Sequence, residues 1–103
     1  MFGRTPWLHD TVRKTMEAER IQSVEGVPDD RTPVIVDVRD LPPPEPLTET
    51  IDAVGDLDRT EMVVQVNDRV PQHLFPRLDE HGLQYETVET DDGAVTAMWI
   101  PPS

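Results

Sequence analysis

The chain of 103 residues contains no cysteine and a single lysine, Lys14. The absence of cysteine excludes disulfides, thiolate catalysis and cysteine-ligated metals. No apolar run approaches the roughly 20 residues that a membrane-spanning helix needs, and the first ten residues lack the apolar centre of a secretory signal. We therefore expect a small cytoplasmic protein that has no membrane as a partner.

Basic residues are also scarce: 21 Asp and Glu stand against 9 Lys and Arg, which gives a net charge of −12. Five basic and six acidic residues leave residues 1–32 at −1, whereas four basic and fifteen acidic residues leave residues 33–103 at −11. Such a charge opposes nucleic acid as a partner. The composition resembles that of cytoplasmic proteins from salt-loving archaea, in which high salt screens the repulsion between acidic groups.

The N-terminal third is expected to form a helical extension and a linker. Thr5-Pro6 is a favourable helix start, and apolar residues then recur every four positions, at Leu8, Val12 and Met16, with Trp7 beside them. The turn formers that follow, from Gly26 to Pro33, predict a linker. We assign residues 1–32 to the extension and 33–103 to the main domain.

The main domain alternates between the periods of strands and helices. Strands are predicted at 34–38, 62–66, 83–89 and 94–100, with one helix that ends at Gly55 and another that Gly82 terminates. Pro76 implies that the second helix begins late or bends. An Asp-Asp-Gly hairpin at 91–93 joins the last two strands. The order β-α-β-α-β-β predicts an α+β two-layer sandwich: a four-stranded mixed sheet with both helices on one face.

The face of the sheet opposite the helices is expected to be apolar and to require a cover. The alternation of side chains assigns Ile35, Val63 and Gln65 to it. Contiguous apolar patches of this kind mark interfaces. We therefore expect an interface that joins Ile35 and Val63 with Trp7, Leu8, Val12 and Met16 of the same chain or a second copy, or with a protein partner.

A ligand site is predicted beyond the ends of the first two strands, where open α/β sheets bind ligands. The candidate ligand-binding residues there are Arg39, Asp40, Asn67, Asp68, Arg69 and His73. The alternative is that each arginine pairs with a neighbouring aspartate and ties the loops together. The three histidines, His9, His73 and His81, lack the spacing of metal ligands, so we expect neither a metal nor a cofactor.

The segment Asp37-Val-Arg-Asp-Leu-Pro-Pro-Pro-Glu-Pro-Leu47 resembles the opening motif of the TusA/SirA sulfur-carrier fold, in which a strand ends in Leu-x-Cys-Pro-x-Pro-Leu. Pro43 occupies the place of the cysteine. The element order is also that of the sulfur carriers and of the C-terminal domain of translation initiation factor 3. The chain is more similar still to family 2249 of domains of unknown function, which often show a turn like Asn67-Asp-Arg-Val-Pro-Gln-His-Leu74. The resemblance covers about residues 34–101.

Sulfur transfer is excluded because the carrier cysteine is absent, and RNA binding is opposed by the charge of the core. Proline at 42, 43, 44 and 46 removes four amide donors, and Glu45 adds a negative charge, so the helix start is a poor anion site. We therefore expect a non-enzymatic accessory or interaction module on the sulfur-carrier fold. The alternative is a small-ligand or metal-binding accessory of a redox system, such as one that handles nitrogen oxides.

Overall fold

The computed structural model describes residues 20–91 and 93–102, and it has the predicted α+β sandwich fold. Four strands form one mixed sheet in the order β1-β2-β4-β3, with β1 parallel to β2 and with β4 antiparallel to both of its neighbours. The strands are β1 (Thr32–Asp37), β2 (Glu61–Asn67), β3 (Gln84–Thr90) and β4 (Gly93–Trp99). The helices are α2 (Glu45–Gly55) and α3 (Leu74–Glu80).

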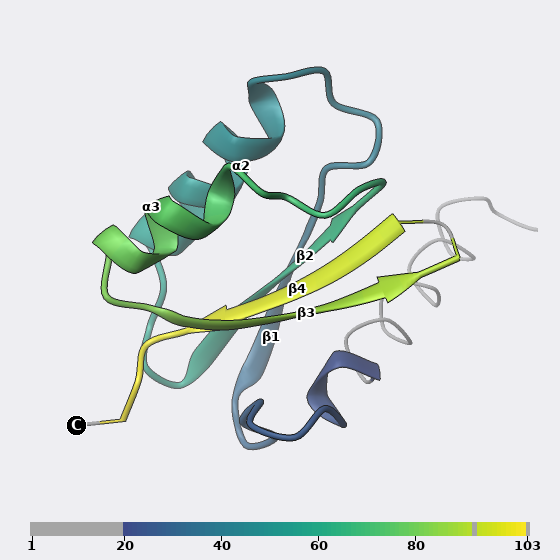
Figure 1. Ribbon diagram of the computed structural model, residues 1–103. Coiled ribbons are helices and arrows are strands. Elements are labelled where there is room, and N and C mark those ends of the chain that lie inside the picture. Colours follow the sequence, from purple (N-terminus) through teal and green to yellow (C-terminus); the bar gives the residue numbers. More distant parts are fainter. Residues whose placement is uncertain (1–19, 92, 103) are drawn as a thin grey trace, which may run out of the picture.

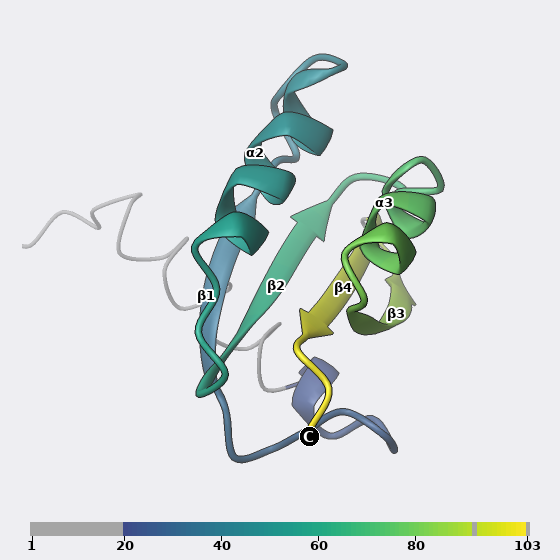
Figure 2. The same ribbon diagram turned by 90° about the vertical axis from the view of Figure 1, so that its left-hand side faces the viewer.

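Both helices cover the same face of the sheet, as predicted (Figures 1 and 2). The core between the two layers joins Val54 of α2 and Leu74 and Leu78 of α3 to Val63 of β2 and Met98 of β4. Val63 lies opposite Met98 in the antiparallel register, so the central strands present one continuous apolar surface to the helices.

The segment that precedes β1 packs on the opposite face of the sheet, where Figure 1 shows it below the strands. Ile21 and Val27 are buried against the residues Met62, Val64, Val95, Ala97 and Trp99. The amide of Val24 donates to the Ile21 carbonyl oxygen, and the amide of Val27 donates to that of Val24, both at 3.1 Å. Two successive three-residue turns therefore direct residues 21, 24 and 27 to the same side. These residues belong to the segment 1–32 that was predicted to form an extension and a linker, and in the structure Ile21, Val24 and Val27 pack against the sheet.

The predicted pairing of Ile35 and Val63 on one face is wrong. In the parallel register Val34 lies beside Val63, and Ile35 lies beside Val64. Val63 belongs to the core on the helix side, where it is buried. Because neighbours in register share a face, Ile35 lies with Val64 on the opposite side, where it packs against the cluster that contains Ile21. Gln65 likewise lies on the helix side, beside Val36.

The ends of α3 account for its proline and its glycine. The helix begins at Leu74, so Pro76 lies in the first turn, where a missing amide breaks no helical hydrogen bond. At the other end Gly82 adopts a φ of 71°, its amide donates to the Asp79 carbonyl oxygen at 3.0 Å, and the Leu83 amide donates to that of Leu78 at 3.0 Å. This pair of bonds is the Schellman motif, which requires the left-handed conformation that glycine adopts readily.

The two edge strands expose different chemistry. The amides of Thr32, the first residue of β1, and of Val38, which follows the strand, donate toward β2. The residues that alternate with them, beginning with Pro33, therefore direct their backbone groups outward. Pro33 has no N–H to offer at that edge. The opposite edge, β3, carries exposed carboxylates at Glu86 and Glu89. Among the described residues, no helix has the length and hydropathy to cross a membrane.

Candidate functional site

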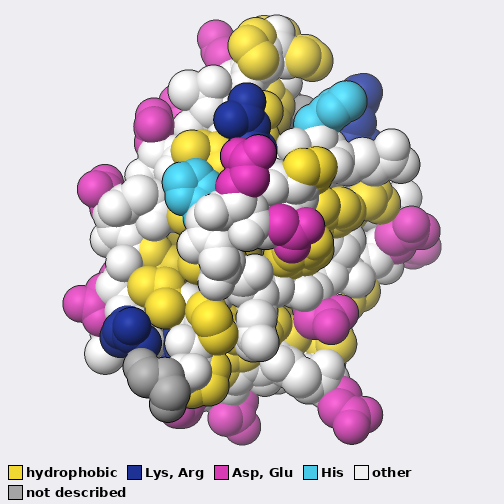
Figure 3. Space-filling view, turned by 60° about the vertical axis from the view of Figure 1, so that its left-hand side comes forward, with side chains coloured by type: hydrophobic (Ala, Val, Ile, Leu, Met, Phe, Trp, Pro, Cys, Tyr) yellow, Lys and Arg dark blue, Asp and Glu magenta, His cyan; other side chains and the backbone are white. Residues whose placement is uncertain are grey.

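A cavity of about 670 Å³ opens between the start of α2 and the loop that joins β2 to α3. We call it the proline cavity. Its apolar lining residues are Leu41, Pro43, Pro44, Pro46, Leu47, Val70, Pro71 and Leu74, and its polar lining residues are Gln65, Asn67, Asp68, Arg69, Gln72 and His73. Figure 3 shows apolar side chains exposed on the helix side of the molecule, with acidic groups dispersed around them. The cavity lies beyond the carboxyl end of β2, the edge at which the sequence predicted a site.

The polar floor of the cavity is a chain of buried and partly buried hydrogen bonds. The Arg69 amide donates to Asn67 Oδ1 at 3.3 Å, and Asn67 Nδ2 donates to Gln65 Oε1 at 3.3 Å. Gln65 Nε2 then donates to Thr50 Oγ1 at 2.8 Å, and that hydroxyl donates to the Pro46 carbonyl oxygen at 2.8 Å. All donors point along the chain toward α2, so the two carboxamides are held in one orientation.

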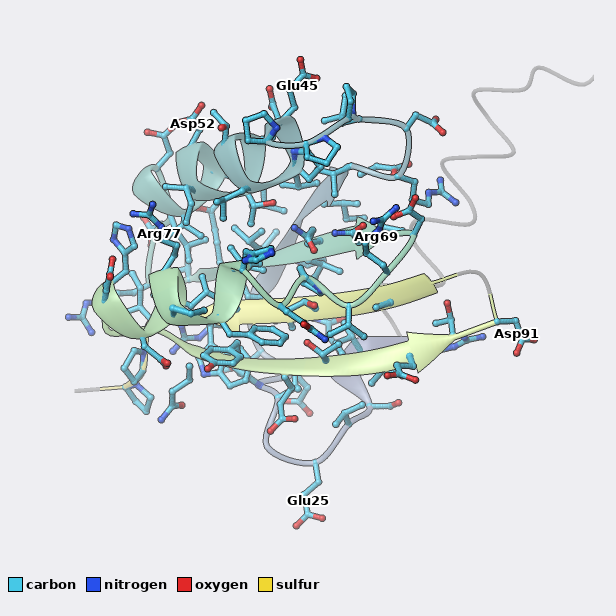
Figure 4. All side chains as sticks on the ribbon, turned by 45° about the horizontal axis from the view of Figure 1, so that its top comes forward. Glu25, Glu45, Asp52, Arg69, Arg77 and Asp91 are labelled. Carbon is cyan, nitrogen blue, oxygen red and sulfur yellow. The ribbon has the colours of Figure 1, made fainter. Side chains whose placement is uncertain are left out.

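The wall formed by the start of α2 offers few amide donors. Pro44 is the N-cap residue, Pro46 follows within the first turn, and neither has an N–H. The Glu45 amide donates to the Pro42 carbonyl oxygen at 3.0 Å, and the first bond that closes a helical turn is from the Thr48 amide to Pro44, at 3.2 Å. In the described part of the chain this leaves the Leu47 amide as the one first-turn donor without a backbone partner. Figure 4 shows Glu45 directed away from the sheet, so its carboxylate adds negative charge outside the cavity.

Asn67, Asp68, Arg69 and His73, four of the six predicted ligand-binding residues, line the proline cavity, and Arg39 and Asp40 do not. The guanidinium of Arg39 grips the Asp37 carboxylate with bonds of 2.9 and 2.7 Å, and Asp37 lies on the face away from the helices. Arg39 therefore pairs with a neighbouring aspartate, as the alternative prediction had it. It does not form one anion site with Arg69.

Arg69 also pairs with a neighbour, Asp68, at 3.2 Å, and Figure 4 shows Arg69 near the end of β2. The Arg69 side chain is 76% exposed and the Asp68 side chain 48% exposed. Exposed pairs of this kind hold their geometry weakly, so Arg69 remains able to reorient at the cavity rim.

The two histidines that the structure describes, His73 and His81, lie at opposite ends of α3. His73 precedes α3 and lines the cavity, whereas His81 follows the same helix at its other end. His9 and the predicted interface residues Trp7, Leu8, Val12 and Met16 lie outside the described residues. Across residues 20–91 and 93–102, no group of three His, Asp or Glu side chains comes together as a metal site would require.

The site contains residues that the sequence reading missed. Gln65 and Thr50 are 1% and 0% exposed, although both are polar. The signals by which they could have been found are a glutamine inside a run of valines and a threonine among the apolar positions of α2, because buried polar side chains need partners.

The model of the family described as "Uncharacterized conserved protein (DUF2249)" matches residues 35–100, which span both helices and all but the start of the sheet. The chain belongs to this family. No curated protein and no solved structure shows significant similarity to the chain. The family match includes every residue that lines the proline cavity, and it excludes residues 20–34. The cavity therefore lies within the part of the chain that matches the family.

Proposed function

We propose that this chain is a non-enzymatic accessory or interaction module that binds its partner through the proline cavity. The observation that supports this function is the lining of the cavity, which combines apolar walls with a floor of two hydrogen-bonded carboxamides. Among the described residues that line it, none carries a thiol or hydroxyl group. The described lining therefore provides apolar surface and hydrogen-bonding groups for binding, and it provides no hydroxyl or thiol nucleophile.

The loop from Leu41 to Leu47 supports the same proposal through its resemblance to the sulfur-carrier motif. Pro43 lines the cavity at the position where that motif has cysteine. Proline rings are rigid and apolar, and they lose no conformational entropy when a partner covers them. A loop of this composition is suited to contact with a partner surface, and it has no cysteine to carry sulfur.

A small-ligand accessory of a redox system is the second candidate, and the size of the cavity favours it. A volume of about 670 Å³ lies within the range of small-molecule sites. Native mass spectrometry of the chain purified under non-denaturing conditions separates the two candidates, because a small ligand would appear as a fixed added mass.

The proposed function is tested with a substitution that places a charge in the apolar wall. Val70→Asp is compared with Thr32→Asp, which adds the same charge at an exposed position at the start of β1, outside the cavity. Wild type and Thr32→Asp, immobilised in high-salt buffer, are expected to retain the same partner from a lysate, and folded Val70→Asp is expected to lose it. Equal retention by all three chains would contradict the cavity as the binding site.

A further inference from the structure

The proline cavity has hydrogen-bond donors that the chain itself does not use, and we infer that it recognises an uncharged group with a carbonyl oxygen, such as a carboxamide or a backbone amide. This inference rests on the proposed function and specifies the chemistry that the cavity binds. It depends on the two carboxamides of the floor, the start of α2 and the charges around the rim.

The floor supplies two spare donors. A carboxamide nitrogen carries two hydrogens, and Gln65 Nε2 uses one of them on Thr50, while Asn67 Nδ2 uses one on Gln65. Gln65 is 1% exposed and Asn67 is 7% exposed, and both line the cavity. The hydrogen-bond chain also fixes the rotation of each carboxamide, and a ligand that binds there loses no energy in ordering them.

A carboxylate or phosphate is disfavoured in this cavity. Anion sites at helix starts depend on several converging N–H groups, and here the N-cap residue Pro44 and the first-turn residue Pro46 are both proline. The charge of Arg69 at the rim is offset by the adjacent carboxylate of Asp68, and the chain as a whole carries a charge of −12. An anion would therefore leave water for a site with few donors and a negative field around it.

A cation is disfavoured for a different reason. The oxygen of each floor carboxamide already accepts one hydrogen bond within the chain, and the charge of Asp68 is offset by the adjacent Arg69. The start of a helix carries partial positive charge, which repels cations. The apolar walls would strip water from an ammonium group without replacing it.

The remaining class is a neutral group with an acceptor oxygen attached to an apolar body. Its oxygen accepts from the spare N–H groups of Gln65 and Asn67, and the unpartnered Leu47 amide stands at the same wall. Its apolar body packs against the prolines and leucines that enclose the rest of the cavity. A partner that presents a peptide backbone and a small molecule that presents a carboxamide satisfy this description equally.

The test is a titration of the ¹⁵N-labelled full chain with benzamide, benzoate and benzylamine, which share a ring and differ in charge. We expect benzamide at millimolar concentration to shift the side-chain NH₂ signals of Gln65 and Asn67, and benzoate and benzylamine to shift them much less. Gln65→Leu is expected to weaken benzamide binding about tenfold, the effect of one lost hydrogen bond. Gln84→Leu, which alters a glutamine outside the cavity, is expected to leave it unchanged.

The inference is overturned if all three probes shift these signals equally, if benzoate or benzylamine binds best, or if none shifts them. The wild-type signals carry the result even if Gln65→Leu fails to fold. Tighter binding of N-acetyl-phenylalanine amide than of benzamide identifies a peptide as the ligand, and the reverse identifies a small molecule; both support the inference. Loss of partner capture in Val70→Asp without any probe binding would retain the proposed function and reject this ligand class.

Discussion

Gln65 Nε2 donates a hydrogen bond of 2.8 Å to Thr50 Oγ1, and this bond joins the central strand β2 to helix α2 inside the core. Both side chains are buried, so neither has water as a substitute partner. The bond therefore links the stability of the two-layer core to the shape of the proline cavity.

Thr50→Val is expected to lower the free energy of unfolding by about 1–3 kcal/mol, because it leaves a buried carboxamide donor without an acceptor. Thr48→Val is the matched control. Thr48 lies on the same helix and donates to the Pro44 carbonyl oxygen at 3.3 Å, but it is exposed, so its replacement should change stability by less than about 0.5 kcal/mol. Urea denaturation of both variants measures the difference, and equal losses would contradict the role given to the Gln65–Thr50 bond.

Gly93→Ala is expected to destabilise the chain by at least about 2 kcal/mol. Gly93 has a φ of 152°, and an added Cβ would overlap the carbonyl oxygen of Asn67 in the adjacent strand. The same substitution at Gly55 meets no atom within 4 Å, and it should be neutral or stabilise α2 slightly. Thermal denaturation compares the two. A Gly93→Ala variant as stable as wild type would show that the backbone yields at this contact without cost.

Ile21→Ala is expected to cost about 2–5 kcal/mol, since Ile21 is fully buried against the sheet. Val24→Ala, at the half-buried position of the same turns, should cost less. Deletion of residues 1–30 should lower stability further and expose apolar surface that binds a hydrophobic dye. A deleted chain that remains equally stable and binds no dye would show that this segment does not contribute to the fold.

Asp58 should make stability depend on acid pH. Its carboxylate accepts hydrogen bonds from the Thr60 amide at 2.8 Å and from the Thr60 hydroxyl at 3.1 Å, and these bonds lower the pKa of Asp58 from 3.8. A group whose pKa is lowered in the folded state contributes stability above its unfolded pKa and loses it as the pH falls through the folded pKa. Asp58→Asn should therefore destabilise at neutral pH and show a smaller loss below pH 3.8. Parallel curves for the two chains would exclude this contribution.

The melting temperature is expected to rise strongly with KCl, because salt screens the repulsion that a net charge of −12 creates on a small fold. Replacing the exposed carboxylates Asp52, Asp56, Glu86 and Glu89 by their amides should reduce this dependence. A melting temperature that does not change from dilute to multi-molar KCl would reject the halophilic reading of the composition.

The types and order of the elements were predictable because each has a clear period and clear ends, as at Gly55 and Gly82. The faces of the strands were not. Which side of the sheet Val63 occupies depends on its register with Val34, and a parallel register is set by crossover packing that no local pattern encodes.

The packing of the segment before β1 on the sheet was difficult to predict from its composition. Gly26 and Pro28 indicate a linker, yet Ile21, Val24 and Val27 recur every three residues, the spacing of successive tight turns. Part of the site was predictable, since polar loop residues after adjacent parallel strands meet at one edge. Arg39 does not line the cavity because it is bound to Asp37 on the other face of the sheet. Gln65 lines the cavity because the register of β2 with β1 places it on the helix side, beside Val36.

The unlike edges of the sheet imply that salt acts on them differently. Pro33 prevents strand pairing at β1 because it has no N–H, and no solvent condition changes this. Glu86 and Glu89 oppose strand pairing at β3 through charge repulsion, which dissolved ions weaken. As the KCl concentration rises, the stability of the fold is expected to increase, while the repulsion that protects the β3 edge from pairing with another chain decreases. Self-association in concentrated brine should therefore begin at β3, and a lysine or proline placed on that strand would keep the chain dispersed where acidic residues no longer can.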